Sequence, residues 1–304
     1  FAMAGLLGLS APAVAQDPDE PIRAAREAFA KRDRSRLASL RASVAESRHP
    51  LAPWVDYWEL NNRLVEAKTD EVEAFYARWP GSYVEDRLRN DWLLELGRRR
   101  DWAGFARDFP RFRMNDDREV TCYAQLVAHQ GGQDVLATAR KAWMAQREPD
   151  DGCQLLAQTL VDAKLLGPDD VLRKLRHATE HNRAKLARQT AALLGDPAVK
   201  AVTAIFDSPV RYLALKANAF GHLRTEMAAL ALGRLAASDN DQAARLLEDR
   251  WTPVLGAEHY VLMYPPGIPP DAFQRNAGTW NNLRDWTSDI GLPCHGVVEI
   301  EPTY

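Results

Sequence analysis

Residues 80–96, PGSYVEDRLRNDWLLEL, carry the signals that decide the fold of this chain. Pro80 and Gly81 end the preceding segment, and Ser82 is a residue type that caps helix N-termini by accepting a backbone N–H. An apolar stripe then follows at helical spacing, made of Val84, Leu88, Trp92, Leu93 and Leu96. The stretch therefore predicts an amphipathic helix that begins after Ser82.

The same pattern recurs along the chain. Apolar periodicity predicts further helices over 21–32, 35–46, 54–64 and 70–79. Beyond them a turn signal recurs after every roughly 12–20 residues, at Gly131-Gly132, Pro149 with Gly152, Gly167-Pro168 and Gly195 with Pro197. Helix pairs at this interval predict an all-α solenoid of short hairpins over residues 16–251. The alternative is a compact helical bundle, which normally has longer helices.

Composition narrows the class of protein. Of 304 residues, 46% are hydrophobic, which is ample for a core and excludes a disordered chain. The 39 basic and 42 acidic residues give a net charge of −3. Nucleic acid as a partner would need a strongly basic face, so we expect none.

The first residues have the form of an export signal. An apolar run, Ala2 to Leu9, precedes Ala13-Val14-Ala15, which resembles a signal-peptidase site. We expect residues 1–15 to be a signal-peptide remnant and the protein to be periplasmic, with no membrane span. A short helix or a membrane anchor is the alternative, but the apolar run is far below the roughly 20 residues that cross a bilayer.

The last residues depart from the helical pattern. Residues 252–304 contain Pro265-Pro266-Gly267 and Pro269-Pro270 but no lysine. We expect a divergent tail that is either disordered or the product of a frameshift near codon 256.

The cysteines fit an oxidising compartment. Cys122 and Cys153 each lie near the start of a predicted helix, and a bridge between them would join successive hairpins. The alternative is two small buried thiols, and Cys294 is left unpaired in the tail.

Several stretches between residues 41 and 113 resemble the N-terminal superhelical region of soluble lytic murein transglycosylases. The matching stretches are His49-Pro50-Leu51-Ala52-Pro53-Trp54-Val55-Asp56-Tyr57-Trp58, Ala74-Phe75-Tyr76-Ala77-Arg78-Trp79-Pro80, Arg87-Leu88-Arg89-Asn90-Asp91-Trp92-Leu93 and Arg99-Arg100-Asp101-Trp102. Cys122-Tyr123-Ala124 and Cys153-Gln154-Leu155 look like the family's paired cysteine positions. The resemblance extends over about residues 20–250.

The resemblance implies a right-handed, U-shaped α-superhelix and a link to peptidoglycan. In that family the superhelix carries a C-terminal lysozyme-like domain. This domain cleaves the β-1,4 bond between N-acetylmuramic acid and N-acetylglucosamine without water and leaves a 1,6-anhydro end. The implied partners are peptidoglycan glycan strands and other cell-wall proteins, and no cofactor is implied.

The family's catalytic motifs do not occur here in context. Glu46-Ser47 matches its Glu-Ser pair but stands at the end of a predicted helix, and Asn276-Ala277-Gly278 matches only part of another motif. We therefore expect no catalytic residues and a scaffold that is catalytically silent. Two alternatives remain: a helical-repeat interaction module unrelated to catalysis, and an all-α polysaccharide lyase, which would need Tyr, His and Arg to converge in a cleft.

A possible zinc motif is weak. His177-Ala178-Thr179-Glu180-His181 has the H-x-x-E-H spacing of inverted zinc peptidases, which places two imidazoles one helical turn apart. Cations surround it and no third ligand is evident, so a charged helix end is the preferred interpretation and we expect no metal site.

Aromatic residues are dense between Trp54 and Phe112. At helical spacing such residues mostly fill the core. Trp79, Tyr83 and Trp102 lie near turns, so we expect these three to bind substrate sugar rings if any do. The arginine-rich turns Arg32-Asp33-Arg34 and Arg98–Asp101 are expected to be solvated helix ends.

Overall fold

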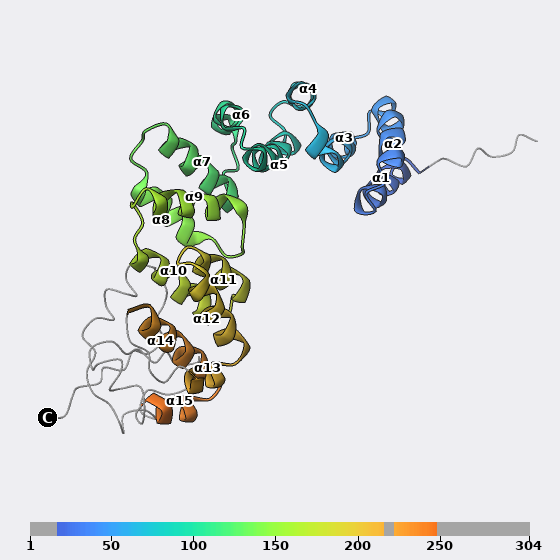
Figure 1. Cartoon of the computed structure of the whole chain (residues 1–304). Helices are drawn as coiled ribbons and strands as arrows, with labels where there is room; N and C mark the ends of the chain where they lie inside the picture. The colour runs from blue at the N-terminus through green and yellow to red at the C-terminus, as the bar shows by residue number, and fades with distance from the viewer. Residues whose placement is uncertain (1–16, 216–221, 248–304) are drawn as a thin grey trace, which may run out of the picture. The chain divides into compact units, whose positions relative to one another are not determined.

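The computed structural model describes residues 17–215 and 222–247, apart from the side chains of residues 46, 47 and 222, as a succession of short helices (Figure 1). Within these ranges every regular element is a helix and none is a strand, which confirms the all-α class. The chain divides into two compact units, Phe1–Val127 and Ala128–Tyr304. The domain boundaries expected after residues 15 and 251, and the tail 252–304, lie outside the described residues.

The helices are short in both units. The first unit contains α1 (Glu20–Ala30), α2 (Arg34–Ser47), α3 (Ala52–Asn62), η1 (Leu64–Glu66), α4 (Thr69–Arg78), α5 (Tyr83–Arg99), α6 (Trp102–Asp108) and η2 (Phe109–Arg111), and α7 (Arg118–Gln130) crosses its boundary. The second contains α8 (Leu136–Ala145), α9 (Asp151–Asp162), α10 (Pro168–Glu180), α11 (Ala184–Ala192), α12 (Asp196–Asp207), α13 (Pro209–Leu215), α14 (His222–Ala236) and α15 (Asn240–Leu246).

The five helices predicted between residues 21 and 96 are all present. Ser82 is the N-cap of α5, and its hydroxyl accepts the backbone N–H of Glu85, as the sequence predicts. The third helix ends at Asn62, two residues early, because Arg63 leaves helical geometry at φ −124° and the chain continues as a 3-10 turn.

Two turns between helices use the same dipeptide, an arginine followed by an aspartate. Arg32 and Arg100 have φ of 57° and 59°, the left-handed conformation that commonly ends a helix. Asp33 and Asp101 then cap the next helix by accepting the backbone N–H three residues further on. This pair reverses the chain in one short turn, although a non-glycine residue in the left-handed region costs roughly 1–2 kcal/mol.

In the first unit, apolar side chains of α1, α2 and α3 form a small core, and α5 is the most deeply buried helix. Leu88, Trp92, Leu93 and Leu96 are each at most 2% exposed, so the predicted stripe faces the interior. The small core consists of Ile22, Ala25, Ala28, Leu37, Val44 and Val55.

A buried arginine connects α4, α5 and α6. Arg89 is 1% exposed; it forms ion pairs with Asp108 and Glu85, and its guanidinium lies 3.9 Å from the ring centroid of Tyr76. The Tyr76 hydroxyl donates to the other oxygen of Asp108 at 3.0 Å. Burial raises the pKa of Asp108, while the Arg89 charge and the Tyr76 hydrogen bond act in the opposite direction. Removing one member of such a pair typically costs about 3–5 kcal/mol, because the other charge stays buried.

In the second unit, most helices pack against their neighbours in sequence. Contacts join α10 to α11, α11 to α12, α12 to α13 and α14, α13 to α14, and α14 to α15. This local packing is typical of helical-repeat arrays. No helix within the described ranges is both long and apolar enough to cross a membrane.

Small residues of α14 allow close packing only in part. Ala228, Ala231 and Ala236 are each at most 2% exposed. Gly233 of the same helix has open space where a side chain would lie, so it makes no close backbone contact. The close approach that depends on a glycine occurs instead in the first unit, where a Cβ on Gly97 of α5 would lie 2.6 Å from Cδ2 of the Tyr123 ring.

These two helical glycines give opposite expectations for the same substitution. Gly97→Ala should lower the free energy of unfolding by about 1–3 kcal/mol, because the buried Tyr123 ring must move. Gly233→Ala should raise it by about 0.5–1 kcal/mol, because alanine favours the helix and meets nothing. Urea unfolding followed by circular dichroism measures both. Equal effects of the two substitutions would contradict the packing described here.

Candidate functional site

Four aromatic rings form a continuous row on α1, α3 and α5 of the first unit, and we call this row the aromatic strip. It consists of Phe29, Trp58, Trp54 and Tyr83. The ring centroids of Phe29 and Trp58 lie 6.2 Å apart, those of Trp58 and Trp54 6.1 Å, and those of Trp54 and Tyr83 6.0 Å. Each ring therefore touches the next, and the row joins the end of α1 to the start of α5.

The local sequence explains why these rings share one surface. Trp54 and Trp58 are four residues apart in α3, so they lie on the same side of that helix. Tyr83 is the first residue of α5 and is 61% exposed, because the Pro80–Ser82 turn places it at a helix end. Trp54, Trp58 and Phe29 are half-buried. The strip is thus partly open to solvent along its length.

Polar groups flank the strip below Trp54. The buried Tyr57 ring meets Trp54 edge-on at 5.7 Å, and its hydroxyl donates to Asp91 at 2.6 Å. Asn61 also donates to that Asp91 oxygen, at 2.8 Å, while Arg87 lies 3.7 Å from the other oxygen. Burial and the Asp91 charge raise the pKa of Tyr57, so its hydroxyl stays protonated and remains a donor.

The structure separates the three aromatic residues predicted to bind sugar. Tyr83 belongs to the strip. The half-buried Trp79 donates its indole N–H to the buried Asp56 at 2.8 Å, which anchors the ring. Trp102 is also half-buried and packs on Tyr123 with a centroid distance of 5.9 Å. Binding by Trp79 and Trp102 stays a prediction.

Sequence reasoning missed the other members of the strip. Trp54 and Trp58 belong to the aromatic-rich stretch that we expected mostly to fill the core. That expectation holds for Trp92, which is 2% exposed, and Trp58 also packs against the small core, as does Phe29. The four-residue spacing of Trp54 and Trp58 was the available signal, since it predicts one shared face, but it does not tell whether another helix covers that face.

The second unit gathers titratable side chains on α10. Burial, together with the nearby charges of His181 and Lys174, lowers the pKa of His177 to about 4. The two imidazole centroids lie 4.3 Å apart, and His181 Nδ1 lies 2.9 Å from the carbonyl oxygen of His177. Among the described residues no three His, Cys, Asp or Glu side chains are grouped so as to hold a metal ion. The histidine pair thus gains no third ligand there.

Lys174 of the same helix is completely buried and binds the end of α8. Its ammonium donates to the carbonyl oxygens of Trp143 at 2.7 Å, Gln146 at 2.9 Å and Met144 at 3.3 Å. These carbonyls lie at the C-terminal end of α8, where the regular helical hydrogen bonds stop, and the Trp143 carbonyl also accepts the N–H of Gln146. Burial lowers the pKa of Lys174 to about 7, and the charge of Asp150 acts in the opposite direction.

Glycoside cleavage needs a carboxyl group that can act as an acid. Burial raises the pKa of Glu180 to about 7, which is a suitable value for a general acid. The hollow described below does not include Glu180 among its lining residues. The side chains of Glu46 and Ser47, and all of Asn276-Ala277-Gly278, lie outside the described residues.

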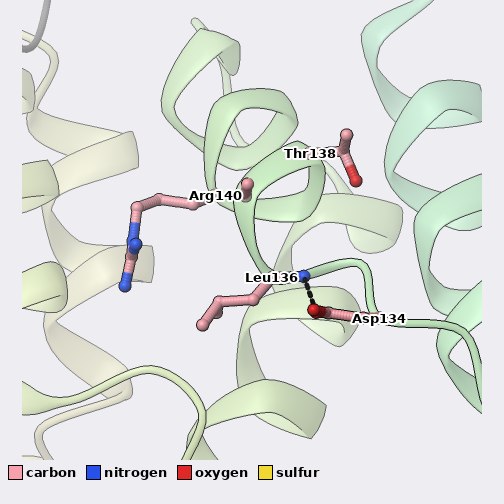
Figure 2. Close-up of a pocket in the computed structure, with 5 residues that line it drawn as sticks. Asp134, Leu136, Thr138 and Arg140 are labelled. Atoms are coloured by element: carbon pink, nitrogen blue, oxygen red, sulfur yellow. Dashed lines mark hydrogen bonds between the residues drawn. The ribbon is translucent and has the colours of Figure 1, made fainter.

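A hollow of about 280 Å³ lies at the start of α8, and Figure 2 shows its lining residues. The Leu136 N–H donates to Asp134 at 3.3 Å. The Arg140 guanidinium forms an ion pair with Asp170 at 2.8 Å, so its charge is already paired within the protein. The hollow therefore holds no carboxyl pair or nucleophile with a base. Its lining consists of Asp134, Leu136, Ala137, Thr138 and Arg140.

Comparisons with solved structures show which proteins share this fold. No family model and no curated protein matches the chain. The 70 kDa soluble lytic transglycosylase from Escherichia coli has a TM-score of 0.53 at 18% identity, covering 76% of this chain and 38% of that chain. The 70-kDa soluble lytic transglycosylase in complex with bulgecin A has a TM-score of 0.54 at 16% identity, covering 90% of this chain and 44% of that one.

A third solved structure is an inactive mutant of the lytic transglycosylase Slt from Pseudomonas aeruginosa. Its identity is 25% and its TM-score 0.48, covering 75% of this chain and 37% of that chain. The fold conclusion rests on the other two structures. This chain has their all-α superhelical fold and spans less than half of their length. The predicted fold class is confirmed.

The disulfide expected from the sequence is present. Cys122 and Cys153 are both disulfide-bonded, and each is completely buried. The alternative of two free buried thiols is therefore wrong. Cys294 lies outside the described residues.

Replacing both cysteines should destabilise the chain. Cys122→Ala with Cys153→Ala is expected to lower the free energy of unfolding by roughly 2–4 kcal/mol, because the unfolded chain loses a cross-link. Urea unfolding of the double variant measures the loss. Wild-type protein treated with a reducing agent is the matched control and should show a similar loss. A double variant as stable as the oxidised wild type would contradict the expectation.

The lowered pKa of Lys174 predicts a pH dependence of stability. Between pH 7 and about 10 the unfolded chain holds this proton and the folded chain does not, so the contribution of Lys174 to stability should increase with pH. The free energy of unfolding of wild type, minus that of Lys174→Met, should become more positive by about 1 kcal/mol per pH unit over this range. Urea unfolding at pH 7, 8 and 9 measures it. A difference that stays constant with pH would refute the prediction.

Proposed function

We propose that this chain is the N-terminal superhelical scaffold of a peptidoglycan lytic transglycosylase, and that it is catalytically silent by itself. The parent activity is non-hydrolytic cleavage of the bond between N-acetylmuramic acid and N-acetylglucosamine. The observation that carries the proposal is the fold match, which takes in 76% and 90% of this chain but only 38% and 44% of the two transglycosylases. The stretches of sequence resemblance between residues 41 and 113 support the same family.

The state of the buried carboxylates supports catalytic silence. Asp56, Glu59, Asp86, Glu95 and Asp108 are the buried acids of the described residues, and each has an arginine within 4 Å. A general acid must be protonated and must face a substrate cleft. Carboxylates that are buried and paired with arginines fit a structural role.

The polysaccharide lyase alternative finds little support. Such an enzyme would need Tyr, His and Arg side chains around one cleft. The hollow at the start of α8 contributes an arginine but neither of the other two. A helical-repeat interaction module stays open as the second candidate, because packing between sequence neighbours leaves helix faces for partners.

We also propose that the protein works in the periplasm. The disulfide supports an oxidising compartment, where such bonds persist. The expected signal segment, residues 1–15, lies outside the described residues. The proposed partners are peptidoglycan glycan strands and other cell-wall proteins.

Digestion of purified murein sacculi tests the proposal. The 304-residue chain should sediment with sacculi and should release no 1,6-anhydro products detectable by mass spectrometry. A complete lytic transglycosylase is the positive control for release. Failure to sediment would favour the interaction module.

Appearance of anhydro products would refute catalytic silence. Glu180→Gln would then be the first variant to make, because Glu180 is the described carboxyl with a pKa suited to a general acid. Loss of product in that variant would identify an active site in the second unit.

A further inference from the structure

The aromatic strip leaves large aromatic rings partly exposed to solvent. Tyr83 is 61% exposed, and Trp54 is absent from the small core that Phe29 and Trp58 pack against. Burying a large aromatic side chain is one of the strongest gains available to a fold. The strip instead leaves aromatic surface in contact with water across three helices.

The composition of the strip favours a saccharide over an apolar protein surface. A pyranose ring has an apolar face of C–H groups and an edge of hydroxyl groups, so it fits a flat aromatic ring beside hydrogen-bonding side chains. Asp91, Asn61 and Arg87 place carboxylate, amide and guanidinium groups around Tyr57, whose ring contacts Trp54 of the strip. A face that docks a protein would also expose aliphatic side chains. Leu51, which is 44% exposed, is the nearby example.

The charge next to the strip also fits a wall glycan. Arg87 is 43% exposed; its guanidinium forms an ion pair with Asp91 at 3.7 Å and also interacts with the Tyr57 hydroxyl. A partly solvated guanidinium can therefore still pair with an anionic group of a ligand. Glycan strands that carry lactyl and peptide carboxylates present such groups beside their sugar rings.

We propose that the aromatic strip binds the sugar rings of a glycan strand, with Tyr83 and Trp54 as the stacking residues and Arg87 as the contact to a carboxylate. This inference rests on the proposed function for the identity of the strand. It adds the binding surface and places it on α3 and α5 of the first unit. Of the three aromatic residues that the sequence analysis expected to bind sugar, the strip includes Tyr83.

Binding measurements on the 304-residue chain test the strip. The probes are the N-acetylglucosamine tetramer, titrated by calorimetry, and murein sacculi, followed by sedimentation. Tyr83→Ala and Trp54→Ala should each weaken tetramer binding by about tenfold or more, as loss of a stacked anchor typically does. Trp54→Phe keeps a ring and should keep most of the affinity. Arg87→Gln should weaken binding to sacculi but not to the uncharged tetramer.

Val65→Ala is the matched control. Val65 is 69% exposed in the same unit and lies outside the strip, so its loss should leave both affinities unchanged. Circular dichroism and the melting temperature show whether each variant is folded. Tyr83→Ala decides the outcome if Trp54→Ala is unstable, because an exposed side chain contributes little to the fold.

The outcomes separate this inference from the proposed function. Wild-type binding to sacculi that Tyr83→Ala and Trp54→Ala leave unchanged would overturn the strip and leave the scaffold function standing. Strip-dependent binding together with release of anhydro products would keep the strip and refute catalytic silence. A wild type that binds neither probe would overturn both.

Discussion

Short helices leave many backbone groups at their ends without partners, and this fold depends on side chains that supply those partners. Lys174 of α10 donates to three carbonyls at the end of α8. Arg99 of α5 does the same around η1, where it donates to the carbonyls of Leu64, Val65 and Ala67. A charged donor can satisfy several carbonyls at once, so one long basic side chain secures both the helix end and the packing of its own helix against it.

Buried acids also connect separate elements at other positions. Asp86 accepts the backbone N–H groups of Arg113 and Met114 at the loop after η2, and Asp108 binds both Arg89 and Tyr76. Such networks favour one arrangement because each member is costly to bury without its partner. They also occupy the carboxylates, which agrees with a scaffold in which the acids hold helices together.

The two units differ in what they offer a ligand. The first leaves a row of aromatic rings partly exposed beside a tyrosine–aspartate–asparagine cluster. In the second unit, Lys174 is completely buried against the carbonyl groups at the end of α8, and Glu180 of the same helix is half-buried. Burial shifts the pKa values of Lys174 and Glu180 on α10. Tyr83 is exposed at the start of α5, and its ring contacts the half-buried Trp54 on the surface proposed to bind glycan.

The sequence by itself determined the first five helices and the local caps and turns that bound them, and it left the Cys122–Cys153 bridge as one of two possibilities. Ser82, the arginine–aspartate turns and the apolar stripe of α5 act through hydrogen bonds and spacing within a few residues, so they can be read locally. Only the tertiary structure decided which aromatic side chains stay exposed. Trp54 and Trp92 are equally apolar at helical spacing, yet neighbouring helices cover Trp92 and leave Trp54 half open. The burial of Lys174 could not be predicted from the sequence either, because its three acceptors lie about thirty residues earlier in the chain. Contacts over that distance depend on how helices stack, which spacing along one helix does not record.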